Sequence, residues 1–147
     1  MRPFSMLTAG LLALATLGPA TPAFADPIPV WSAETITWMI DRPAGTKLTY
    51  LEGDAQTPDK VLTYAFKMPD GAWFPAHTHP SAARVFVMKG VLLLGEGASA
   101  DRARARRISA GQVALVPAGV AHYEGAEGET VIIGVATGPW RTDFIKP

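Results

Sequence analysis

The chain of 147 residues contains no cysteine. It therefore has no disulfide, thiol nucleophile or thiolate metal ligand, and any metal ion must be held by His, Asp or Glu. Long apolar runs are also lacking, because the longest, Met6 to Leu17, has 12 residues where about 20 are needed to cross a bilayer. Neither sign of charge is in excess, since 13 basic residues face 13 acidic ones, which argues against a nucleic-acid partner.

The first 25 residues have the pattern of a secretory signal peptide. Arg2 precedes the apolar run, and the small-residue sequence Ala23-Phe24-Ala25 precedes Asp26. We therefore expect cleavage before Asp26, a periplasmic or secreted location, and no membrane contact after cleavage. Removing 25 of the 147 residues leaves 122, residues 26–147, which is the length of one domain with its own hydrophobic core.

Short segments rich in β-branched and aromatic residues predict strands, and turn residues separate them. These segments are Lys47–Leu51, Val61–Met68, Arg84–Met88, Val113–Val116 and Val131–Val135. The pair Lys89-Gly90 predicts a tight hairpin connection after the third of them. Many short strands without a helical pattern predict an all-β sandwich or barrel.

All three histidines of the sequence lie in two short segments. His77 and His79 are two residues apart, so on a strand both imidazoles point to the same face and can converge on one ion. His122 follows a tight turn at Pro117 and Gly119, from which it can supply a third nitrogen from across a barrel. The sequence therefore predicts a metal site formed by His77, His79 and His122.

The same two segments resemble the two motifs of the cupin superfamily. The first motif is a Gly, five residues, His-x-His, a Glu and a later Gly, and the second is a Gly, five residues, Pro-x-Gly, two residues, His and an Asn. The matching residues are Gly71, His77, His79, Gly90, Gly111, Pro117, Gly119 and His122. The chain also resembles a group of small exported bacterial single-domain cupins at Trp38, Gly53-Asp54 and Gly138-Pro139-Trp140.

This resemblance implies an all-β fold, an antiparallel double-stranded β-helix of the jelly-roll-like cupin kind. It implies a divalent transition metal as cofactor, and imidazole ligands suit Fe, Mn, Ni or Zn without selecting among them. The implied partner is a small-molecule ligand or substrate held in the barrel. Cupins often pair, so the resemblance also implies a homodimer.

The sequence departs from the cupin motifs at two positions. Ala83 stands where the first motif has its Glu ligand, and Ala126 stands where the second has its Asn. Three neutral imidazoles would leave the full charge of a divalent ion and more open coordination positions, which favours an anionic or chelating ligand. This site is similar in type to those of the three-histidine thiol and β-diketone-cleaving dioxygenases. Glu124, two residues after His122, is an alternative fourth ligand.

Other residues are candidate parts of a substrate pocket. Alternation with the histidines predicts an apolar cavity lined by Trp73, Pro75, Val85 and Val87. The phenols of Tyr64 and Tyr123 are candidate hydrogen-bond or proton donors to a substrate, although tyrosines most often fill a core. With Glu124 they are the catalytic candidates. Arg84 can pair with a substrate carboxylate only if it faces inward, and its parity places it outside.

Three functions are compatible with these observations. The first is a metal-binding cupin that acts on a small oxygen-bearing or chelating molecule, as a dioxygenase-like oxygenase, an isomerase or a lyase. The second is a non-catalytic periplasmic cupin that binds or senses a small ligand. The third is a barrel whose histidines only fill the core. Fold alone does not choose among them.

Overall fold

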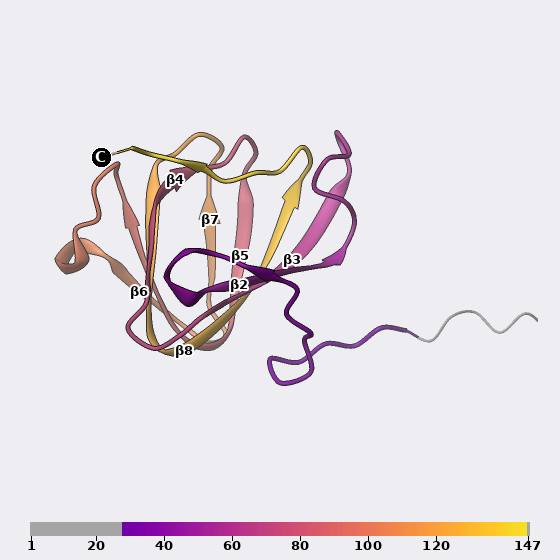
Figure 1. The fold of residues 1–147 in the computed structure, drawn as a ribbon, viewed down its shortest axis with the longest axis horizontal. Coiled ribbons are helices and arrows are strands. Elements are labelled where there is room, and N and C mark those ends of the chain that lie inside the picture. The colour runs from indigo at the N-terminus through magenta and orange to yellow at the C-terminus, as the bar shows by residue number, and fades with distance from the viewer. Residues whose placement is uncertain (1–27, 147) are drawn as a thin grey trace, which may run out of the picture. The chain divides into compact units, whose positions relative to one another are not determined.

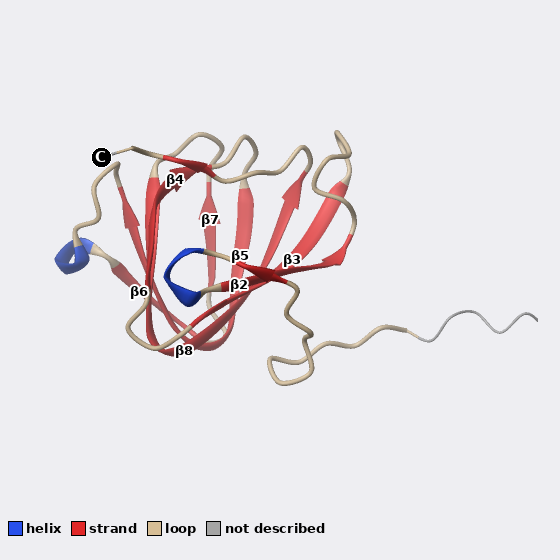
Figure 2. Ribbon diagram, viewed as in Figure 1, coloured by secondary structure: helices blue, strands red, loops and turns tan. Residues whose placement is uncertain are grey.

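The computed structural model describes residues 28–146, and the predicted signal peptide at residues 1–25 lies outside them. The regular secondary structure of the described residues is almost entirely β-strand, as predicted (Figure 2). Its elements are β1 (Ile40–Asp41), η1 (Pro43–Gly45), β2 (Lys47–Glu52), β3 (Val61–Met68), β4 (Trp73–Thr78), β5 (Ala83–Glu96), η2 (Arg102–Arg104), β6 (Arg106–Ser109), β7 (Val113–Val116), β8 (His122–Thr137) and β9 (Asp143–Phe144). Within residues 28–146 no helix has the length and apolar character needed to cross a membrane.

Two long strands, β5 and β8, organise the barrel, and they pair antiparallel along most of their lengths (Figure 1). The second half of β8 also pairs with β3, whereas its first half pairs with β4. In the same way the start of β5 pairs with β7 and its end pairs with β6. The two halves of each long strand therefore have different outer partners within one curled antiparallel sheet, as in the double-stranded β-helix that the cupin resemblance implied.

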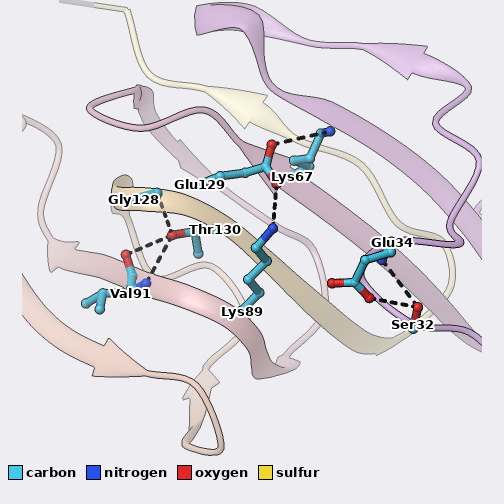
Figure 3. A network of polar contacts seen from close by, with 8 residues as sticks. All are labelled: Ser32, Glu34, Lys67, Lys89, Val91, Gly128, Glu129 and Thr130. Carbon is cyan, nitrogen blue, oxygen red and sulfur yellow. Dashed lines mark hydrogen bonds and ion pairs between the residues drawn. The ribbon is translucent and has the colours of Figure 1, made fainter.

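The predicted hairpin at Lys89-Gly90 is wrong, because β5 runs through this position without turning back. The register with β8 shifts on both sides of Lys89, which is the signature of a β-bulge. Gly90 has a φ of +74°, a conformation that side chains disfavour. The hydroxyl of Thr130 accepts the Val91 N–H at 3.1 Å, so the bulge leaves this donor satisfied (Figure 3).

A small group of charged side chains lies at the surface around the bulge. Glu129 on β8 lies between two lysines, 3.0 Å from the Nζ of Lys89 and 3.7 Å from that of Lys67 (Figure 3). Lys67 also lies 5.3 Å from the centroid of the Trp38 ring. Because these side chains are partly exposed to solvent, each ion pair contributes little to stability.

The main core fills the inside of the barrel. On β3 the alternate residues Leu62, Tyr64, Phe66 and Met68 are buried there. Val85 and Val87 of β5 join them from the other sheet. A second, smaller cluster lies on the outer face of β3 and β8, where Ile36 packs on Ala65 and Val131. The segment before β1 thus covers one outer face of the barrel.

Candidate metal centre

The three histidines come together inside the barrel. His77 on β4 pairs directly with His122 on β8, and their ring centroids are 4.2 Å apart. The ring of His79, just after β4, lies 4.8 Å from that of His77 and 5.2 Å from that of His122. One ring nitrogen from each residue lies within 4.8 Å of the others, which is a group that can hold a metal ion. From the sequence we expected His122 to lie across the barrel from the other two histidines. In the structure it comes instead from β8, the strand next to β4.

The main chain orients all three imidazoles in the same way. Nδ1 of His77 lies 2.7 Å from the carbonyl oxygen of Pro75. Nδ1 of His79 lies 2.7 Å from the Arg141 oxygen, and that of His122 lies 2.9 Å from the Val120 oxygen. A carbonyl oxygen can only accept, so each Nδ1 carries the proton and donates it. Each Nε2 is then unprotonated and has a free lone pair, and this is the tautomer that can bind a metal through Nε2.

Burial keeps these imidazoles neutral. It lowers the pKa of His77 to about 3, with a further contribution from the neighbouring His122. Burial also lowers the pKa of His79 to about 4 and the pKa of His122 below its ordinary value. Metal binding therefore does not have to compete with a proton at neutral pH.

A cavity of about 290 Å³ opens beside the histidines. Its apolar walls are Leu48, Phe66, Phe74, Ile132 and Trp140, and its polar lining is Arg42, Tyr50, Gln56, Tyr64, His77, His79, Glu124, Arg141 and Thr142. The volume approaches the lower end of the range for small-molecule sites. The mixture of aromatic walls and a few polar groups suits a small organic ligand.

The predicted cavity lining was wrong in detail. Pro75 is exposed, and Trp73 lies over Gly125 with the Arg102 guanidinium 5.0 Å from its ring centroid. The β4–β8 register shifts between Phe74 and His77, and this irregularity breaks the strict alternation on which the prediction depended. Phe74 faces the cavity instead, with its ring 5.1 Å from His77. The two valines proposed with Trp73 are buried core residues and do not line the cavity.

The two candidate tyrosines have different environments. Tyr64 lines the cavity, with its ring stacked 5.4 Å from that of Trp140. Burial raises its pKa, so the phenol stays protonated. Tyr123 is buried away from the cavity, and its hydroxyl donates to the Asp101 carbonyl oxygen at 2.6 Å. The structure thus brings Tyr64 to the site and gives Tyr123 a structural contact.

Glu124 also lines the cavity, since it shares the inward face of β8 with His122. It is only 6% exposed, and burial raises the pKa of its carboxyl group to about 7. It is not a member of the group of three converging nitrogens. Ala83 and Ala126 are buried at the positions of the motif Glu and Asn, so neither offers a polar group.

Trp140 and Arg42 are among the cavity residues that were not found from the sequence. The indole of Trp140 stacks on His79 with ring centroids 4.0 Å apart and an interplanar angle of 22°. Arg42, just after β1, also lines the cavity. Arg42 lies 35 positions before His77 in a segment without a motif, and only the fold brings it to the site.

Comparison with known proteins agrees with this architecture. The family model described as Cupin matches residues 59–138, which is more than half of the chain and includes both histidine motifs. The chain therefore belongs to the cupin family.

Individual relatives are distant. Germin-like protein 5-1 from Oryza sativa subsp. japonica is 39% identical over 61 residues, which are 41% of this chain and 28% of that protein. The chain spans between 28% and 41% of the length of the germin-like proteins it matches. Among solved structures, the polyketide cyclase RemF from Streptomyces resistomycificus has a TM-score of 0.63 at 17% identity, covering 82% of this chain and 87% of its own. KdgF from Halomonas sp. has a TM-score of 0.56 at 18% identity, and the match covers 76% of this chain and 94% of KdgF. These structures share the fold.

Proposed function

We propose that this cupin holds one divalent transition metal ion on the Nε2 atoms of His77, His79 and His122, and acts on a small oxygen-bearing or chelating molecule in the adjoining cavity. The observation that carries this proposal is the orientation of the imidazoles. All three Nδ1 atoms are engaged by main-chain carbonyl oxygens, so three neutral lone pairs converge. This donor set suits Fe, Mn, Ni or Zn.

A bound ion would supply a Lewis acid that polarises an oxygen of the ligand. Three uncharged ligands leave its full charge in place, and the buried methyl group of Ala83 adds no carboxylate. The protein residues around the site therefore favour an anionic or chelating molecule over a neutral one with a single donor.

The chain also provides groups that can handle protons. The Glu124 carboxyl group lines the cavity and, with its pKa raised to about 7 by burial, is part protonated at neutral pH. Such a group can give or take a proton at the same pH. The Tyr64 hydroxyl can donate a hydrogen bond to a bound oxygen. These groups support an oxidative cleavage, isomerisation, elimination or hydrolysis of the bound molecule. The apolar walls of the cavity limit the access of water to it.

A second function, non-catalytic binding or sensing of a small ligand, is favoured by the two motif departures. Ala83 and Ala126 remove the Glu and Asn of the cupin motifs. Steady-state turnover of any chelating substrate by the metal-loaded protein would eliminate this alternative. Loss of that turnover in Glu124→Gln, with metal content unchanged, would place the carboxyl group in the reaction.

Thermal unfolding tests the metal site itself. The melting temperature of the chelator-treated protein should rise when Fe(II), Mn(II), Ni(II) or Zn(II) is added, because an ion held only by the folded state stabilises it. His77→Gln should lose this response, and Glu96→Gln, an exposed carboxylate change at the end of β5, should keep it. An equal response in all three proteins, or none in the parent, would favour histidines that only fill the core.

We also propose that the protein is exported and acts in the periplasm or outside the cell. The support is the order of Arg2, the apolar run and Ala23-Phe24-Ala25. The full chain expressed in a bacterial host should yield a mature protein whose mass corresponds to a start at Asp26. A cytoplasmic product that retains residues 1–25 would contradict export.

A further inference from the structure

Arg42 is held at the cavity by the local backbone. It follows β1 and directly precedes η1, one of the two short helices coloured blue in Figure 2. Its N–H donates to the Thr46 carbonyl oxygen at 2.9 Å, and the Thr46 hydroxyl donates to the Pro43 oxygen at 2.8 Å. Thr46 itself is fully buried, so the turn is anchored to the barrel. The side chain of Arg42 therefore starts from a fixed point.

The guanidinium of Arg42 lies against two aromatic rings. Its Cζ is 5.9 Å from the ring centroid of Phe74 and 5.9 Å from that of Phe144. Both rings also lie close to His77, at centroid distances of 5.1 Å and 6.1 Å. Contacts with ring faces hold a guanidinium in place but do not use its N–H groups. Arg42 is thus positioned beside the histidines with its donors available.

No carboxylate among residues 28–146 pairs with this guanidinium, and no hydrogen bond to its side chain occurs within the same residues. Two other arginines do make such pairs. Arg141, which also lines the cavity, has its Nε 2.9 Å from Asp143, and Arg107 pairs with Glu127. Glu124, the acidic residue of the cavity lining, makes no ion pair with Arg42. The half-buried cation therefore faces the cavity uncompensated.

An uncompensated, partly desolvated guanidinium gains most from a carboxylate, whose two oxygens match its fork of N–H groups. The remaining surface of the cavity determines the size and polarity of the rest of the ligand. Leu48, Phe66 and Ile132 form an apolar wall, and a volume of about 290 Å³ admits a small ring or short chain. Tyr50 and Gln56 add hydrogen-bonding groups to the lining.

We propose that Arg42 is the anion-binding residue of this cavity and that its ligand is a small organic carboxylate with an apolar body. The inference deepens the proposed function, on which it rests for the chemistry at the histidines. The carboxylate subsite itself needs only Arg42 and the cavity, so it is present in the metal-free protein. A different role, in which Arg42 only covers Phe74 and Phe144, predicts effects on stability without effects on ligand choice.

Benzoate and its neutral isostere benzamide are suitable probes, because they differ in charge and hardly in shape. Their dissociation constants are measured by calorimetry on the full chain after chelator treatment, and again after metal loading. The metal-free parent should bind benzoate about tenfold or more tightly than benzamide, as expected for a charge-assisted hydrogen-bonded pair. Arg42→Gln should abolish that difference by weakening benzoate alone, and Arg42→Lys should retain part of it.

Arg104→Gln is the matched control, since Arg104 is exposed in η2 and does not line the cavity. It should leave both dissociation constants unchanged. Equal affinities for the two probes in the parent, including no binding of either, would overturn the proposal. So would a preference for benzoate that survives in Arg42→Gln, even if the melting temperature falls. A preference lost in Arg42→Gln by a protein that takes up no metal would retain the subsite and reject the metal site.

Discussion

His77 and His122 are cross-strand partners on β4 and β8, and their imidazole centroids lie 4.2 Å apart. Two protonated imidazoles at this separation would repel each other, and both are buried, so the neutral forms are strongly favoured. Their Nδ1 protons are held by the oxygens of Pro75 and Val120. The cross-strand pairing therefore presents two lone pairs to one point, and His79 adds a third.

The tyrosines of the site should respond differently to removal of the hydroxyl. Tyr123→Phe removes the buried hydrogen bond to the Asp101 oxygen and should lower the free energy of unfolding by about 1 kcal/mol, without changing metal content. Tyr64→Phe removes no hydrogen bond to the described residues and should leave stability close to that of the parent. Urea unfolding measures both. A larger loss in Tyr64→Phe would contradict the assigned environments.

The β-bulge at Gly90 should be intolerant of a side chain. A Cβ atom there would lie 2.5 Å from the Glu129 oxygen and from the Thr130 hydroxyl, in addition to the strain of a positive φ. Gly90→Ala should therefore cost about 3 kcal/mol or more. Gly128→Ala, at a φ of +71° with open space around the added atom, should cost only about 1 kcal/mol. Similar unfolding midpoints for the two variants would argue against the bulge.

The metal-free protein should lose stability as the pH falls from 7 to 5.5. The pKa of each site histidine is lower in the folded state than the ordinary 6.5, so the unfolded chain binds more protons in this range. His77 and His79, with pKa values of about 3 and about 4, should each cost about 1 kcal/mol, and His122 contributes in the same direction. Denaturant unfolding in the presence of chelator, at both pH values, checks the sign. The variant with His77, His79 and His122 all changed to Gln should lose this decrease, and a parent that gains stability on acidification would contradict it.

Glu124 should have the opposite pH dependence. Burial raises its pKa from 4.5 to about 7, so the folded state holds the proton more tightly. The protonated Glu124 carboxyl group therefore contributes stability that is fully present below pH 4.5 and is lost as the pH rises through 7. The free energy of unfolding of Glu124→Gln, minus that of the metal-free parent, should be about 2 kcal/mol larger at pH 8 than at pH 5. The exposed change Glu96→Gln should show no such gain. Metal content should be unchanged in Glu124→Gln, and its loss would instead make Glu124 a fourth ligand.

The strands and the histidine group could be predicted because local spacing determines them. Val61–Met68 and Val113–Val116 were found with their observed bounds, since their composition and the turn residues around them are local signals. His77, His79 and His122 were found because their spacing matches a strand and a turn. The position of Glu124 on the inward face follows from the same alternation. The place of Tyr123 outside the cavity lining follows from the same alternation, because it lies between His122 and Glu124 on β8.

Features that depend on strand pairing could not be predicted. Nothing local distinguishes the bulge at Gly90 from a hairpin, because glycine permits both conformations. The irregularity between Phe74 and His77 exchanges the residues that face the cavity. Arg42 and Trp140 come from the two ends of the barrel sequence, so their contact with the site is purely tertiary.

Elemental analysis of the purified protein tests the metal site most directly. The parent, prepared without chelator, should contain about one equivalent of a transition metal per chain. A variant with His77 and His122 changed to Ala should contain none, and the exposed change Glu96→Gln should contain as much as the parent. No metal in the parent even after reconstitution, or equal metal in the histidine variant, would contradict the assignment of His77, His79 and His122 as ligands.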